Sequence, residues 1–194
     1  MIPTEFSTTH LSLRPFDPTD AGDVFAYWSS DPSWERFNAS VPEDFTLADA
    51  EDFVERMRER DRRAAPNWAL VNEGKVMGVV SLVFEENQQI AVLGYGIHSD
   101  LRGRGLTLEA VSAVIDLAFE HHGSLQRIRA HTDPENLASR RVLEKLGFTH
   151  EGTLRQNQFV KGRLVDEAIY GILRQEWQAS GDVIPHQEHF PGEK

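Results

Sequence analysis

The chain has 194 residues, of which 40% are hydrophobic and 26% charged, and these values are typical of one globular domain rather than of a disordered or fibrous chain. It contains no Cys, which excludes disulfides, thiol nucleophiles and Cys-ligated zinc or iron–sulfur sites. The longest mainly apolar run, residues 76–84, is much shorter than the ~20 residues of a membrane helix, and no secretory signal is readable. We therefore expect a cytoplasmic protein without a membrane partner.

The net charge of −11 is concentrated in the first half of the sequence. Residues 1–100 carry 18 acids and 8 Lys or Arg, whereas residues 101–194 carry 13 acids and 12 Lys or Arg. An acidic surface repels phosphate backbones, so we expect no nucleic-acid partner. The acidic half has two interpretations, which are a solvated face that aids solubility and an attraction for a cationic partner.

Hydrophobic periodicity and turn residues predict one α/β domain with a mixed sheet of about seven strands and about four helices. Three consecutive strands between residues 68 and 98 exclude a Rossmann fold, which needs alternating strands and helices. Residues 1–177 are expected to form the domain, and residues 178–194, which lack periodicity, a loosely held tail. The expected elements are, in chain order, a strand at 10–16, helices after Asp17 and after Thr46, strands at 68–71, 76–84 and 89–98, a helix at 106–119, a strand at 126–132, a helix at 136–146, and strands at 148–154 and 164–173.

A loop with two glycines and two arginines, residues 102–107, lies between a predicted strand and the longest predicted helix. Its backbone N–H groups can point outward at the helix N-terminus, where the helix dipole favours a phosphate. Gly103 and Gly105 permit close approach of the backbone, and Arg102 and Arg104 add charged donors. The alternative is an ordinary glycine-containing loop, but neither a P-loop nor a dinucleotide-binding fingerprint fits the sequence.

Several further motifs occur in a fixed order along the chain. They are Gly94-Tyr-Gly-Ile97, Arg102-Gly-Arg-Gly105, Asp133-Pro-Glu-Asn136 with Ser139, Arg141-Val-Leu-Glu-Lys-Leu-Gly-Phe148 and Glu151-Gly-Thr-Leu-Arg155. With this spacing the chain resembles the GNAT superfamily of N-acetyltransferases, and within it the RimJ/RimL-like branch that acetylates the N-termini of ribosomal proteins. The resemblance implies a GNAT fold, with a mostly antiparallel sheet that splays open at the central strand before the Arg/Gly loop. It also implies an enzyme that transfers the acetyl group of acetyl-CoA to a primary amine.

The resemblance carries the cofactor-binding residues over to this chain. The pantetheine arm of acetyl-CoA is expected to lie along residues 95–98 as an added strand would, which assigns Ile97 and His98 to the cofactor. Asn136 is expected to contact the same arm, and an ordinary helix N-cap, which is compatible with that contact, would also explain it. The family usually has Gly or Ala where this chain has Thr107, and we expect the phosphate site to tolerate the change. The residues expected at the pyrophosphate are Arg102, Gly103, Arg104, Gly105, Leu106 and Thr107.

Acetyl transfer requires a neutral amine, a stabilised oxyanion and a leaving thiolate. Backbone N–H groups of the central strand are expected to stabilise the oxyanion. Ser139 is our candidate for the donor to the thiolate, and Tyr95 is the alternative. Val92 stands where this branch often has Glu, so we leave the general base unassigned. His98 and Glu35 are the remaining candidates for the base, with a solvated surface role as the alternative for each.

Three functional interpretations follow from these residues. The favoured one is an N-acetyltransferase that acts on a protein N-terminal amine. The others are an acetyltransferase for a small amine, such as a polyamine or aminoglycoside, and a non-catalytic acyl-CoA-binding regulatory module. Residues 5–55 hold 12 acids against Arg14 and Arg36, and in the GNAT fold this region borders the acceptor, so we expect a cationic acceptor. The His residues show no metal-ligand spacing, so acetyl-CoA is the only expected cofactor. The sequence does not decide between a monomer and a homodimer.

Overall fold

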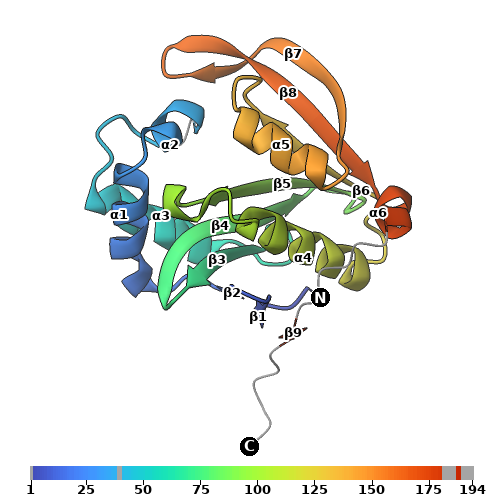
Figure 1. Ribbon diagram of the computed structural model, residues 1–194, viewed down its shortest axis with the longest axis horizontal. Helices are drawn as coiled ribbons and strands as arrows, with labels where there is room; N and C mark the ends of the chain where they lie inside the picture. Colours follow the sequence, from blue (N-terminus) through green and yellow to red (C-terminus); the bar gives the residue numbers. More distant parts are fainter. Residues whose placement is uncertain (1, 39–40, 181–186, 189–194) are drawn as a thin grey trace, which may run out of the picture.

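The computed structural model describes residues 2–38, 41–180 and 187–188, and these form a single mixed sheet with helices on both faces (Figure 1). The described part contains nine strands in the order β7-β8-β6-β5-β4-β3-β2-β1-β9, and all neighbours are antiparallel except β5 and β6. The strands are β1 (Phe6–Ser7), β2 (Ser12–Arg14), β3 (Asn67–Asn72), β4 (Lys75–Phe84), β5 (Ile90–Ile97), β6 (Arg127–Thr132), β7 (Thr149–Val160), β8 (Arg163–Leu173) and β9 (Gln187–Glu188). The helices are α1 (Ala21–Ser29), α2 (Pro32–Phe37), α3 (Leu47–Glu59), α4 (Leu106–His121), α5 (Leu137–Lys145) and α6 (Arg174–Ser180), with short 3-10 helices η1 (Pro18–Asp20) and η2 (Ser99–Leu101).

The sheet separates two hydrophobic cores. Successive side chains of a strand point to opposite faces, so Trp68 and Ala69, adjacent on β3, are both fully buried but belong to different cores. The larger core is built around α4, whose residues 110–118 are almost all buried, and the smaller core lies under α1 and α3. No helix in the described ranges combines the length and apolar composition needed to cross a bilayer. The predicted α/β class with a mostly antiparallel sheet is confirmed.

The expected numbers of strands and helices, about seven and about four, were too low for the described part of the chain, which has nine strands and six α-helices. The helix α2 was missed because it has only six residues, too few for a periodic pattern. The strand β7 runs to Val160 rather than to residue 154, since residues 155–159 are exposed and give no alternation of buried and exposed positions.

The ends of the chain also differ from the prediction. The expected strand 10–16 pairs only over Ser12–Arg14, because a turn closed by the Thr8 N–H and the Leu11 carbonyl precedes it. The last helix, α6, ends at Ser180, and Gln187–Glu188 pair with β1. The other residues after 180 lie outside the described part, so the loosely held tail stays a prediction.

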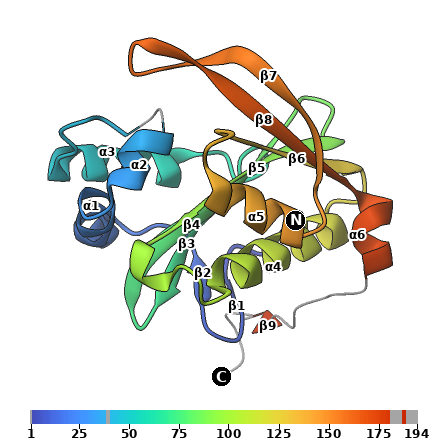
Figure 2. The ribbon, with the colours of Figure 1, turned by 45° about the horizontal axis from the view of Figure 1, so that its top comes forward.

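The two parallel strands at the centre of the sheet pair over only half of β5. Their last paired residues are Leu93 and Ala130, and beyond this point residues 94–97 pair with β4 alone. The backbone groups of a strand alternate in direction, and the His98 N–H bonds the Met77 carbonyl in β4. The N–H groups of Tyr95 and Ile97 therefore face the gap between β5 and β6. The predicted splay is confirmed, and Figure 2 shows the β7–β8 hairpin arching away from the sheet on the far side of this gap.

The short helix α2 packs against the open half of β5. Asp31 caps it, Pro32 occupies its first turn, and Trp34 is buried over Gly96. A Cβ atom built on Gly96 would lie only 2.0 Å from Cη2 of the Trp34 ring. Only glycine leaves room for the indole, so this glycine determines how closely α2 approaches β5.

We expect Gly96→Ala to lower the free energy of unfolding by about 1–3 kcal/mol, because the added methyl group overlaps an indole that buried aromatic rings hold in place. Gly22→Ala in α1 is the control, since a Cβ there meets no atom within 4 Å, and it should leave stability unchanged or slightly raised. Urea unfolding of both variants measures the difference. Equal stabilities would show that Trp34 does not need glycine beneath it.

Candidate active site

The Arg/Gly loop ends in an open helix N-terminus. Gly103 and Gly105 have φ values of +73° and +82°, which L side chains rarely adopt, and Gly105 is the N-cap of α4 without a side chain to bond the first N–H groups. A Cβ at either glycine would meet no protein atom within 4 Å, so the space in front of the helix is open. Uncapped N–H groups, the positive end of a helix dipole and open space together suit an anion.

The two arginines of this loop occupy different surroundings. Arg102 forms an ion pair with Asp31 and donates a hydrogen bond to Ser33 Oγ at 3.0 Å, so its guanidinium holds α2. Arg104 is exposed, and within the described residues no ion pair involves it. The side chain of Leu106 is buried in the main core, so only its backbone can contribute to an anion site, while Thr107 is half-buried on the first turn of α4.

Tyr95 and Ser139, the two candidate donors to the thiolate, are in direct contact. The Tyr95 hydroxyl lies 2.9 Å from Ser139 Oγ and 3.1 Å from the Ser139 carbonyl oxygen. Burial raises the pKa of Tyr95 to about 12, so the phenol keeps its proton at neutral pH and can donate it in a hydrogen bond. Asn136 caps α5 by accepting from the Ser139 N–H at 3.1 Å, which confirms the N-cap interpretation and fixes the first turn that carries Ser139.

Of the two candidates for the general base, the structure describes the side chain of His98 only, and this side chain is not placed to act. The Nδ1 atom of His98 accepts from the Asp100 N–H at 3.1 Å, so the neutral ring carries its proton on Nε2, which lies 3.3 Å from Ser30 Oγ. No lone pair of His98 is left for an amine, and its role here is to cap η2. Val92 pairs with Val83 and Arg129 and supplies no carboxylate. The side chain of Glu35 lies outside the described part.

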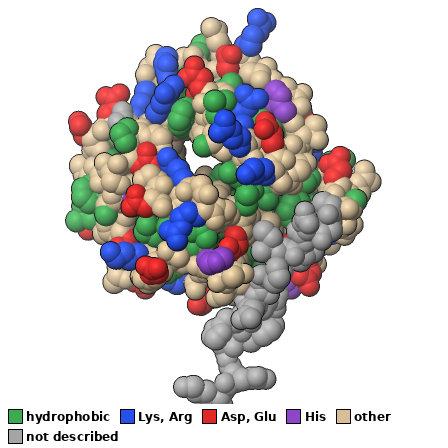
Figure 3. Space-filling model, viewed as in Figure 1, with side chains coloured by type: hydrophobic (Ala, Val, Ile, Leu, Met, Phe, Trp, Pro, Cys, Tyr) green, Lys and Arg blue, Asp and Glu red, His purple; other side chains and the backbone are tan. Residues whose placement is uncertain are grey.

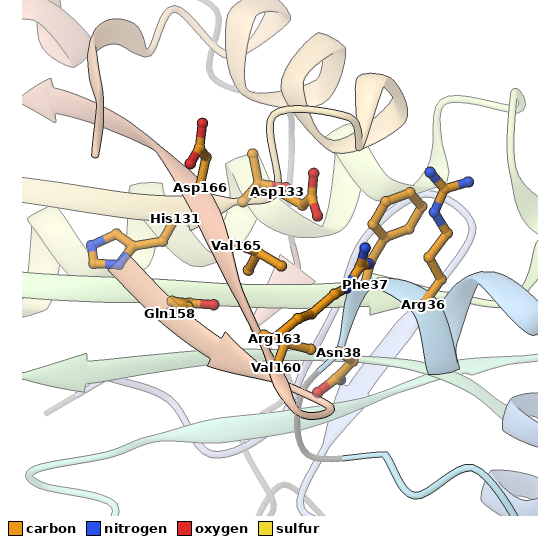
Figure 4. Close-up of a pocket in the computed structure, with 11 residues that line it drawn as sticks. Arg36, Phe37, Asn38, His131, Asp133, Gln158, Val160, Arg163, Val165 and Asp166 are labelled. Carbon is orange, nitrogen blue, oxygen red and sulfur yellow. The ribbon is translucent and has the colours of Figure 1, made fainter. Parts of the chain in front are cut away.

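A pocket of about 250 Å³ opens beside the gap between β5 and β6. Figure 3 shows the hollow between α2 and the β7–β8 hairpin, with Lys and Arg side chains around it. In Figure 4 Arg163 extends across the pocket toward Phe37, and His131 lies at the opposite end. None of its residues is among the candidate catalytic or cofactor-binding residues, because α2 and the tip of the hairpin give no periodic signal in the sequence. The lining residues are Arg36, Phe37, Asn38, His131, Thr132, Asp133, Gln158, Val160, Arg163, Val165 and Asp166.

Most charged groups of the pocket already bind protein groups. Arg36 pairs with Glu135 at 2.6 Å, and His131 Nδ1 lies 3.0 Å from Oε1 of Glu167, a carboxylate that is only 3% exposed. Asp166 accepts from the Gln156 N–H at 2.9 Å. The pocket is therefore polar and prearranged, with both signs of charge on its wall. Among the described residues no three His, Asp or Glu side chains are grouped as a metal site needs.

The fold and the loop agree with a known family. Residues 10–149 match the family described as an acetyltransferase (GNAT) domain. The chain belongs to the GNAT acetyltransferase family. This confirms the resemblance seen in the sequence motifs, and this GNAT protein is accordingly an N-acetyltransferase, as its relatives are.

Three similar proteins illustrate the family. The uncharacterized N-acetyltransferase p20 of Bacillus licheniformis is 32% identical over 176 residues, which are 88% of this chain and 96% of the relative. The ribosomal protein uS5 alanine N-acetyltransferase of Escherichia coli (strain K12) is 28% identical over 108 residues, 55% of each chain. The microcin C7 self immunity acetyltransferase MccE, solved in complex with acetyl-CoA and AMP, shares the fold with a TM-score of 0.78 at 20% identity, covering 85% of this chain and 93% of that chain.

The open N-terminus of α4 predicts the effect of Gly105→Asp. The carboxylate would stand where an anion is expected, and like charges about 4 Å apart repel by about 4 kcal/mol at a protein surface, so affinity for coenzyme A should fall at least ~100-fold. Gly105→Asn is the matched control, because it has the same shape and the same unfavourable φ without the charge. Calorimetry with coenzyme A measures both variants. Equal affinities of the two variants, or unchanged affinity in Gly105→Asp, would place the phosphates elsewhere.

The contact between Tyr95 and Ser139 predicts that Ser139→Ala lowers kcat by about tenfold and changes the Kd of acetyl-CoA less, because a donor to the thiolate is needed most in the transition state. Tyr95→Phe should have a smaller effect in the same direction, and the double variant should be no worse than Ser139→Ala. Single-turnover rates and acetyl-CoA titrations separate the two quantities. Wild-type rates in Ser139→Ala across the pH range would assign the serine to packing alone.

Proposed function

We propose that this GNAT enzyme transfers the acetyl group of acetyl-CoA to the N-terminal amine of a protein. The observation that carries the proposal is the arrangement on the two sides of the gap between β5 and β6. Tyr95 and Ser139 lie on one side, toward α5, and the pocket opens on the other, toward α2. A thioester held in the gap would present its sulfur to the hydroxyl pair and its carbonyl carbon to an amine from the pocket.

The residues that would hold acetyl-CoA lie around the same gap. The outward N–H groups of Tyr95 and Ile97 can bond the pantetheine arm or the oxyanion, and the N–H groups of residues 103–107 can bond the pyrophosphate. The guanidinium of Arg102 is paired with Asp31, so Arg104 is the arginine of this loop that would supply positive charge to the pyrophosphate. Solved GNAT neighbours such as MccE bind acetyl-CoA, which supports the same cofactor here.

In the proposed reaction the lone pair of the amine attacks the thioester carbonyl, the carbon–sulfur bond breaks to release the coenzyme A thiolate, and the proton that the amine loses passes to solvent water. Ser139, polarised by the neutral Tyr95 phenol, donates a hydrogen bond to the departing thiolate. A thiolate with a pKa near ~8.5 leaves readily, so a hydrogen bond is enough help.

An N-terminal amine is chosen as the acceptor because it needs less help from a general base to lose its proton than a lysine-like amine does. A lysine-like amine with a pKa near ~10.4 is almost fully protonated at pH 7, whereas about a tenth of an α-amine with a pKa near ~8 is already neutral. Val92 supplies no carboxylate, and the lone pair of His98 accepts the Asp100 N–H, so neither residue can act as a general base. An α-amine, which is partly neutral already, is the acceptor that needs such a base least. The relative from Escherichia coli, named as acetylating ribosomal protein uS5, supports the same acceptor class.

A small amine is the second candidate, because a prearranged pocket of about 250 Å³ would suit a small molecule. Release of free thiol from acetyl-CoA, measured against peptides with free and with blocked N-termini, spermidine and an aminoglycoside, separates the candidates. The proposal expects turnover only with free N-terminal amines. Turnover with spermidine or the aminoglycoside alone would favour the small amine, and no turnover with any of these amines would overturn both candidates.

The acidity of the first half predicts a salt dependence for the acceptor. Residues 43–55 carry exposed acids, including Glu43, Asp44, Glu51 and Asp52, which can attract a cationic peptide end. The screening length falls from ~10 Å at ~0.1 M to ~3 Å at ~1 M salt, so kcat/KM for the best acceptor should drop steeply over this range. Acetyl-CoA affinity over the same range is the control. A neutral or anionic best acceptor, or a flat salt profile, would assign the acids to solubility.

A further inference from the structure

We propose that Arg102 and Asp31 are positioning residues for the acceptor, an inference that rests on the proposed function. Their ion pair links the loop expected to bind the cofactor to the N-terminus of α2, which forms one wall of the pocket. The side chain of Arg102 then serves acceptor binding, although its place in the Arg/Gly loop points at first to the phosphates.

Asp31 is built into the start of α2. It is 7% exposed, its Oδ1 atom accepts from the Ser33 N–H at 2.9 Å, and its other oxygen faces Arg102. The Arg102 guanidinium also donates to Ser33 Oγ at 3.0 Å. One guanidinium therefore holds two adjacent points of the first turn of α2. A nearly buried carboxylate without its cation is strongly disfavoured. The first turn of α2 is therefore held where Asp31 can reach the Arg102 guanidinium.

The other described contacts of the helix hold its middle and its C-terminal end. Its six residues are too few to be stable as an isolated helix, so α2 depends on tertiary contacts. Trp34 over Gly96 fixes its distance from β5. At its C-terminal end Arg36 pairs with Glu135, but both side chains are more than half exposed, and exposed pairs contribute little. The aromatic rings of Tyr27 and Trp28 hold the indole of Trp34, and the pair of Arg102 and Asp31 fixes the N-terminal turn of α2 beside it.

The far end of the same helix forms the pocket wall. Arg36, Phe37 and the following Asn38 line the pocket, within two turns of Asp31. A rotation of α2 about Trp34 would displace these side chains from the acceptor. The N–H groups of residues 103–107, which face the expected phosphates, would keep their positions because α4 is fixed by the main core.

The test uses Asp31→Asn and Arg102→Gln in the full chain. Asn is as good an N-cap as Asp, so Asp31→Asn removes the charge of the pair and keeps the cap. Each variant should raise the KM of the best peptide acceptor from the thiol-release panel by about tenfold and change the Kd of acetyl-CoA less than about twofold. The double variant should match the single variants, because both remove the same pair. Arg104→Gln is the matched control in the same loop, and it should weaken acetyl-CoA binding instead.

A second measurement keeps the proposal separate from the proposed function. Backbone hydrogen exchange over residues 33–37 should be faster in both variants than in the wild type, with no change over α4, whether or not any amine is acetylated. Failure of every amine to react in the wild type would overturn the proposed function alone. Two results would overturn the positioning role of the pair. One is that Arg102→Gln weakens acetyl-CoA binding as much as Arg104→Gln does and leaves the KM of the acceptor unchanged. The other is that hydrogen exchange in α2 stays at the wild-type rate in both variants.

Discussion

The separation of β5 from β6 after Leu93 and Ala130 is the constraint on which the site depends. Backbone N–H and C=O groups in a sheet need partners, and a strand that loses one neighbour presents a row of them to whatever lies alongside. Here that row belongs to residues 94–97 in the middle of the sheet, where an extended ligand can take the place of the missing strand. Elements flank the gap on both sides, with the β7–β8 hairpin beyond β6 and α2 against β5.

Strand geometry then distributes the functions around the gap. Tyr95 and Gly96 are adjacent, so their side-chain positions point to opposite faces of the sheet. Tyr95 meets Ser139 of α5 on one face, while Gly96 admits Trp34 of α2 on the other. Tyr95 thus fixes the position of Ser139, the donor expected at the sulfur, and the next residue, Gly96, fixes the position of α2, which forms a wall of the acceptor pocket. Because β5 pairs with β4 along its length, the strand is rigid, and the positions of Ser139 and Trp34 relative to each other are fixed.

The charges of the first half have local functions as well as any long-range one. Asp20 binds Arg14 through two hydrogen bonds of 2.8 Å. Asp17 is the N-cap of η1, and Asp49 completes the capping box of α3 by accepting from the Thr46 N–H at 2.8 Å. The hydrogen bonds from Thr19 and Thr46 lower the pKa of these two carboxyl groups. Asp23 accepts from the Val76 N–H at 2.9 Å and so joins α1 to β4. Part of the acidity is therefore structural. A cationic acceptor would be attracted only by the acids that remain exposed.

The sequence by itself determined the α/β class, the family, and the loop at residues 102–107, because hydrophobic periodicity, glycine positions and fixed motif spacing are properties of the chain. It also selected Tyr95 and Ser139 separately. Only the tertiary structure decided that these two hydroxyls touch, because they lie 44 residues apart and meet where α5 crosses the open half of β5. The partner of Arg102 and the pocket were likewise decided by the fold, since a six-residue helix and an exposed hairpin have no periodic signal and acquire their roles from what they pack against.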